Sequence, residues 1–144
     1  MSICIVIADS SKARILSAQS GYGPLQDDRD FIHPESRLRE QDLIADRTGS
    51  GSDSGGYGKH SMGHENTALQ KEAETFAHEL RNEIDKLRLT GDLRRIYLIA
   101  PPKFLGLLRS GINKQCAELL AGEISKDLVN HIIEDIRSLL PKHM

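Results

Sequence analysis

The sequence predicts a long amphipathic helix in TALQKEAETFAHELRNEIDKLRL (residues 67–89) and a buried strand in RRIYLIA (residues 94–100). Apolar residues recur at helical spacing in the first segment and form one stripe: Leu69, Ala73, Phe76, Ala77, Leu80, Ile84 and Leu87. The opposite face of this helix is charged. The second segment is apolar after its two arginines, which is typical of a strand covered on both faces. A helix that leads into a buried strand indicates an α/β fold.

Strands are also predicted at the start of the chain. Residues 3–8 (ICIVIA) and 13–18 (ARILSA) are apolar runs separated by turn-prone Asp and Ser residues, so they predict a hairpin. A third strand is expected around residues 25–33, where Pro34 ends it.

The carboxyl-terminal part of the sequence continues the alternation. Two prolines end the strand at 94–100, and a helical segment follows that Gly111 interrupts. A short strand at residues 122–124 precedes a last helix, which Ser125 or Asp127 would cap. These elements predict a single α/β domain, residues 1–144, with a mixed sheet of about five strands and flanking helices.

A flexible Gly/Ser-rich loop is predicted at about residues 46–66. Its segment DRTGSGSDSGGYGKHSMGH contains ten Gly or Ser residues and no Leu, Ile, Val or Phe, so it cannot bury a core. Loops of this length are either functional or disordered. An ion pair of Asp46 with Arg47 or with Arg14 would fix the hinge of the loop, next to Gly49. Ordinary surface charges, which contribute little to stability, are the alternative.

Composition limits the function classes. The chain has 19 Lys and Arg residues against 21 Asp and Glu, and its net charge of −2 excludes a nucleic-acid binder of the usual basic kind. Any RNA contact must therefore be local, and no DNA partner is expected. Cys4 and Cys116 lie in apolar patterns, which indicates small buried hydrophobes in a reducing cytoplasm. No apolar segment approaches the roughly 18 residues that span a bilayer, so we expect a cytoplasmic protein without a membrane partner. No cofactor is predicted, and the oligomeric state stays open.

Three aspartates are candidates for metal-dependent hydrolysis, because paired carboxylates at strand ends can hold two divalent ions. Asp9, Asp46 and Asp127 each have an ordinary interpretation as well, namely a turn residue, an ion-pair partner and a helix cap. His60 and His64 have the spacing of metal ligands on one helix face, but the glycines around them argue against a helix there. Solvated loop histidines are the favoured interpretation, and no metal site is predicted.

A basic cluster is predicted in APPKFLGLLR, residues 100–109. Lys103 and Arg109 would lie near the first turns of a helix, where they could contact phosphate. Structural prolines and solvated cations are the alternative. Gly106 would allow the close approach of a neighbouring element.

Three groups of residues resemble the bacterial host attachment protein family: ADSSKARIL at 8–16, HPESR and DRTGS beginning at 33 and 46, and APPKFLGLLR at 100–109 with KDL at 126–128. This family is similar to the middle domain of archaeal and eukaryotic class-I peptide release factors. The resemblance implies a ribonuclease-H-like fold and a ribosome-associated role. Release factors carry a Gly-Gly-Gln loop where this chain has GGY at 55–57, so the resemblance does not extend to their ester hydrolysis.

We interpret the sequence as that of a non-catalytic or weakly catalytic factor that associates with the ribosome or another RNA assembly. Tyr57, Lys59 and His60 would be the contact residues of the loop, because an aromatic ring and cations among glycines suit base stacking and phosphate contact. Lys103 and Arg109 would extend this surface. Two alternatives stay open: a metal-dependent phosphodiester or ester hydrolase, and a protein-interaction module for cell attachment whose loop becomes ordered on binding.

Overall fold

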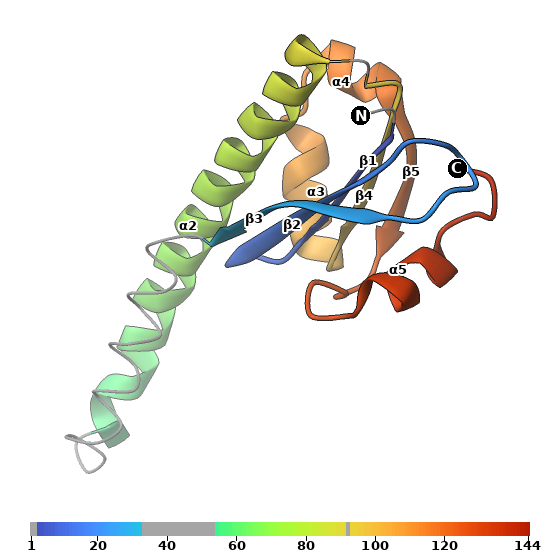
Figure 1. Cartoon of the computed structure of the whole chain (residues 1–144). Helices are drawn as coiled ribbons and strands as arrows, with labels where there is room; N and C mark the ends of the chain where they lie inside the picture. The colour runs from blue at the N-terminus through green and yellow to red at the C-terminus, as the bar shows by residue number, and fades with distance from the viewer. Residues whose placement is uncertain (1–2, 33–53, 92) are drawn as a thin grey trace.

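The fold is built on one sheet. The structure, a computed structural model, describes residues 3–32, 54–91 and 93–144, with side chains from residue 67 onward in the second range. The described strands form a five-stranded mixed sheet in the order β3-β2-β1-β4-β5 (Figure 1). Their bounds are Ile3–Ala8 (β1), Lys12–Ala18 (β2), Gln26–Ile32 (β3), Arg95–Ala100 (β4) and Leu120–Ser125 (β5).

Strand directions divide the sheet into two parts. β1, β2 and β3 form an antiparallel meander, and β4 and β5 run parallel to β1. This arrangement is that of a ribonuclease-H-like sheet, and it confirms the predicted hairpin, the third strand and the α/β class. Because β1, β4 and β5 are parallel, their carboxyl ends meet at one edge of the sheet.

Helices cover both faces of the sheet (Figure 1). α2 (Ser54–Thr90), α3 (Pro102–Ser110) and α4 (Lys114–Leu119) pack on one face, and α5 (Ile133–Leu139) packs on the other. Side chains of β1 alternate between the two hydrophobic clusters, because successive residues of a strand point to opposite faces. Cys4 and Val6 belong to the cluster beneath α2, whereas Ile5 and Ile7 belong to the cluster beneath α5.

The amino-terminal part of α2 corrects the predicted loop at 46–66. The helix begins at Ser54 and runs for 37 residues, so residues 54–66 are helical, while residues 46–53 lie outside the described chain. The core-facing stripe after residue 67 supplies the costly helix nucleus, and each further residue then adds one hydrogen bond. We call residues 54–66 the arm, because this part of α2 extends past the sheet (Figure 1).

The last helix is shorter than the sequence predicts. α5 begins after Ile132, whose side chain makes no capping hydrogen bond, so neither Ser125 nor Asp127 caps it. Ile132 and Leu139, two residues with helical apolar spacing, are 61% and 42% exposed. A loop, residues 126–132, replaces the expected first turns of the helix. Within this loop the backbone carbonyls of Val129 and His131 accept hydrogen bonds from the Arg14 side chain of β2.

Both cysteines are buried and free, as predicted. Burial raises the pKa of the Cys4 thiol to about 12, and the negative charge of Asp28 adds to this shift. Burial also raises the pKa of the Cys116 thiol, with a further contribution from Asp85. Neither thiol therefore has the thiolate character of a reactive cysteine.

A polar junction joins α2 to α4. Oδ1 of Asp85 accepts hydrogen bonds from Nδ2 of Asn113 at 2.8 Å and from Nε of Arg88 at 2.9 Å. Oδ1 of Asn113 in turn accepts from the backbone N–H of Cys116 at 2.8 Å and caps α4. The hydrogen bond from Asn113 and that from Arg88 hold the pKa of the Asp85 carboxyl below its ordinary value of 3.8.

This junction predicts a pH dependence of stability. The pKa of Asp85 is lower in the folded than in the unfolded state, so its contribution is complete above the unfolded value of 3.8 and is lost as the pH falls through the folded value. We expect Asp85→Asn to lower the urea midpoint near neutral pH and to lower it less at about pH 2.5. Glu118→Gln, a charge removal elsewhere on the surface, should change neither midpoint. An equal loss at both pH values would contradict the assignment.

Candidate functional site

A cleft of about 740 Å³ lies at the edge where the parallel strands end. Its lining includes residues that follow β1, β4 and β5 and residues from α2, among them Asp9, Leu69, Glu72, Lys103, Phe104 and Asp127. The chain leaves β1 toward β2 on one side and leaves β4 toward β5 on the other. A crevice opens between strands at such a reversal, and ligands of α/β proteins commonly bind there.

Asp9 shapes the floor of the cleft. Its Oδ1 accepts hydrogen bonds from the backbone N–H of Ser11 and of Lys12, both at 2.8 Å, and from the Ser11 hydroxyl at 3.1 Å. The backbone N–H of Asp9 donates to the carbonyl of Lys12 at 2.9 Å. These contacts confirm the turn role predicted for Asp9, and they hold its carboxylate in one orientation.

Two cations of β2 hold the loop that carries Asp127. Nζ of Lys12 donates to Oδ1 of Asn130 at 2.5 Å, and Nη1 of Arg14 donates to the carbonyls of Val129 and His131 at 3.3 Å and 2.6 Å. Nη2 of Arg14 also pairs with Asp27 of β3 at 3.2 Å. This role of Arg14 was not predicted from the sequence. The proposed pairing of Arg14 with Asp46 lies outside the described residues, as do Arg47 and Gly49.

The predicted basic cluster is divided between two places. Lys103 lines the cleft at the start of α3, where Pro101 precedes the helix and provides no side-chain cap. Arg109 lies in the last turn of α3, and its guanidinium pairs with Glu123 of β5 at 2.8 Å. The prediction that both cations lie near the first turns is therefore wrong for Arg109, because six residues of helix separate them by about 9 Å along the axis.

Carboxylates dominate the charge of the cleft. Asp9 and Asp127 both line it, as the hydrolase hypothesis requires, and α2 adds Glu72, which the sequence analysis missed. Among the residues that the structure describes, no three His, Cys, Asp or Glu side chains are grouped as metal ligands. Asp46 lies outside this part of the chain, so metal-dependent hydrolysis stays a prediction.

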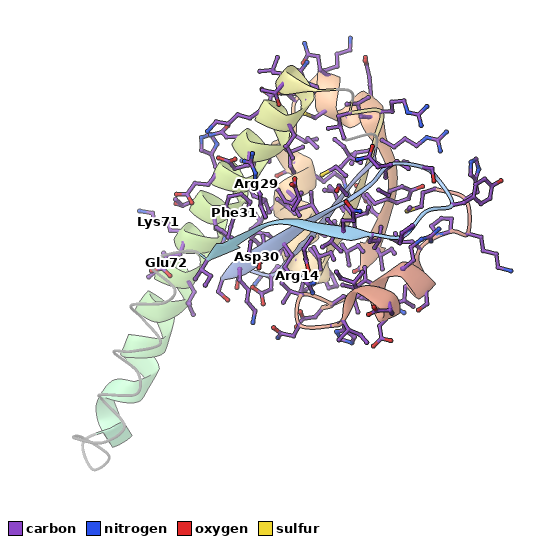
Figure 2. The ribbon with its side chains drawn as sticks, in the orientation of Figure 1. Arg14, Arg29, Asp30, Phe31, Lys71 and Glu72 are labelled. Atoms are coloured by element: carbon purple, nitrogen blue, oxygen red, sulfur yellow. The ribbon has the colours of Figure 1, made fainter. Side chains whose placement is uncertain are left out.

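An ion pair joins β3 to α2 on the carboxyl-terminal side of the arm. Figure 2 shows Arg29 and Phe31 where β3 meets α2, and Lys71 and Glu72 farther along α2 toward the arm. Nη1 of Arg29 pairs with Glu83 of α2 at 3.3 Å, so the helix is fixed to the sheet on the carboxyl-terminal side of the arm.

The backbone of the arm is helical, whereas the sequence predicts a loop there. This helix contains Tyr57, Lys59, His60 and His64, whose side chains lie outside the described part of the chain. The two histidines are thus one helical turn apart along the backbone, contrary to the loop expected for them.

A family model described as "Protein required for attachment to host cells" matches residues 4–140. The chain belongs to this family. Membership in the host attachment family confirms the resemblance carried by the motifs at 8–16 and 100–109. No curated protein sequence matches the chain.

One solved structure similar to this host attachment family chain is the archaeal translation termination factor aRF1. The two chains share 15% sequence identity, and their superposition has a TM-score of 0.44. The match covers 84% of this chain and 29% of the aRF1 chain, so this chain spans less than a third of that factor's length. In the described residues of this chain, no helix has the length and apolar character needed to cross a membrane.

Proposed function

We propose that this protein binds an RNA-containing assembly through the arm of α2. The observation that carries this proposal is the position of SGGYGKHSMGH, residues 54–64, on a helix that extends past the sheet (Figure 1). This segment contains one lysine, two histidines and one tyrosine, and it has no acidic residue. The amino-terminal end of a helix also carries a partial positive charge, which favours phosphate.

Charge distinguishes the arm from the cleft as an RNA-binding surface. Among the described lining residues, the cleft has three carboxylates, from Asp9, Glu72 and Asp127, and one ammonium, that of Lys103. Phosphate would be repelled there without a bridging cation. Residues 54–64 of the arm offer the local positive charge of Lys59 that the overall charge of −2 does not supply, with Glu65 following them, and Tyr57 offers a ring on which a base can stack.

The ribosome is the first assembly to test. The sequence resembles a family related to release-factor middle domains, which implies a ribosome-associated role. The arm lacks the Gly-Gly-Gln sequence, so we propose binding without ester hydrolysis. The glycines of the arm have no side chains, so this part of the helix is thin enough to suit a narrow polar space.

Sedimentation with purified ribosomes tests the proposal. We expect Lys59→Glu to reduce the ribosome-bound fraction several-fold and to lower the slope of binding against salt by about one, because one phosphate contact is lost. Lys114→Glu makes the same charge change on α4 and should leave binding unchanged. Tyr57→Ala should weaken binding, whereas Tyr22→Ala, at a tyrosine that is 74% exposed on the body, should not. Equal effects of each variant and its control would refute the role of the arm.

A further inference from the structure

We propose that the cleft at the carboxyl edge of the sheet binds an arginine or lysine side chain of a protein partner. The inference goes beyond RNA binding by the arm, because it concerns a separate surface and a ligand of opposite charge. It depends on the place of the cleft in the fold, the chemistry of its lining residues and the contacts that anchor the segments of Asp9 and Asp127.

The segments that carry Asp9 and Asp127 are held in place before any ligand arrives. Asp9 receives its described hydrogen bonds on Oδ1, from a turn that fixes the carboxylate. Asp127 belongs to the loop 126–132, which Lys12 and Arg14 hold against β2 through Asn130 and the backbone. A ligand cation therefore meets one carboxylate that a turn fixes and a second on a loop that is anchored to β2, which lowers the cost of ordering the site on binding.

Apolar side chains of α2 and α3 also line the cleft. They are Leu69, Ala73 and Leu107, with Phe104, which is 3% exposed, and the same two helices bring Glu72 and Lys103 to the lining. Leu69 is 46% exposed although it belongs to the core-facing stripe of α2, because this turn of the helix lies at the rim of the cleft. Arginine and lysine have an aliphatic stem that packs on such a surface and a charged head that reaches a carboxylate.

An organic cation suits this cleft better than the alternatives. A phosphate would face Asp9 and Asp127, and Lys103 is the sole basic side chain among the described lining residues. A metal ion would need a compact set of ligands, and the described residues contain no such group of three. A guanidinium or ammonium on an aliphatic stem can use both the carboxylates and the apolar side chains of the cleft.

Fluorescence anisotropy with a fluorescein-labelled hexa-arginine peptide tests the proposal. Asp9→Asn keeps the Oδ1 acceptor that the turn needs and removes only the charge. We expect the double variant Asp9→Asn/Asp127→Asn to weaken peptide binding about tenfold, from the loss of two partly exposed ion pairs. The control Glu118→Gln/Glu134→Gln removes the same two charges from exposed positions on α4 and α5 and should leave affinity within twofold.

Lys103 gives the sharpest discrimination, because the proposal fixes the sign of its effect. Lys103→Gln should strengthen binding of the hexa-arginine peptide by removing a like charge from the cleft. If the cleft held RNA phosphate instead, the same variant would weaken binding of an oligonucleotide and leave the peptide unaffected.

Four outcomes would overturn the proposal. They are no binding of the peptide, equal loss in the control double variant, weaker peptide binding by Lys103→Gln, and displacement of the peptide by millimolar MgCl₂ but not by matched NaCl. The last would indicate a metal site. None of these results depends on ribosome sedimentation, so the two proposals can fail separately.

Discussion

Replacing Leu80 with alanine is expected to lower the free energy of unfolding by about 3 kcal/mol. Leu80 is 1% exposed and lies in the cluster that α2 forms with the sheet and α3. The substitution removes buried methyl groups and leaves a cavity that neighbouring rigid elements cannot fully close. Urea unfolding followed by far-ultraviolet circular dichroism measures the loss, since the chain has no tryptophan.

The matched control for Leu80 is Leu89, which lies on the same helix. Leu89 is 67% exposed, so Leu89→Ala should change the free energy of unfolding by less than about 0.5 kcal/mol. A similar loss in both variants would contradict the assignment, because alanine is a better helix former than leucine and only Leu80 has buried packing to lose. Because α2 carries the arm and several residues that line the cleft, loss of its packing would also weaken both proposed binding activities.

The sequence was most informative where a periodic pattern meets a packed face. Phe76, Ala77 and Leu80 are buried, as the helical stripe of α2 predicts, and RRIYLIA forms the buried strand β4. Periodicity identifies the apolar face of a helix but does not show where the sheet beneath it ends. Leu69 belongs to the same stripe and yet is 46% exposed and lines the cleft.

The glycines of this chain were hard to interpret from the sequence. The glycines of the arm indicated a loop, whereas the helix anchored after residue 67 continues through them. Gly106 was expected to allow a close contact, but no atom lies within 4 Å of the position that a Cβ would take there. The close approach is at Gly111, where an added Cβ would lie 2.3 Å from Cζ of Arg81. A guanidinium from another helix leaves no signature next to Gly111 in the sequence.

The sequence predicted that Asp9 and Asp127 belong to the candidate site, but not the contacts that hold the site together. Asp9 and Asp127 follow strands, and parallel strands bring such positions to one edge. The sequence does not show that Arg14 fixes the loop of Asp127, because two of its acceptors are backbone carbonyls, which every residue has. Nor does it separate Lys103 from Arg109, since their distance depends on which end of α3 faces the cleft.

A second large loss of stability is expected from Arg137→Ala, about 2 kcal/mol. The Arg137 guanidinium donates to four backbone carbonyls: those of Gly21, Gly23, Pro141 and Lys142, at 3.3, 3.2, 2.8 and 2.9 Å. It thereby joins the turn between β2 and β3 to residues 141–144. The backbone N–H of Met144 completes the contact by donating to the carbonyl of Gly21 at 2.9 Å.

The effect of Arg137→Ala should depend on the guanidinium and not only on its charge. Arg137→Lys should recover little of the lost stability, because an ammonium has three donors on one atom and cannot span carbonyls from two segments. Arg94→Ala removes an exposed arginine and should be nearly neutral in urea unfolding. Hydrogen exchange adds a local measurement: the amide of Met144 should exchange faster in both Arg137 variants than in wild type. Full rescue by lysine would show that Arg137 acts as a point charge, and unchanged exchange at Met144 would show that the guanidinium does not hold these two segments together.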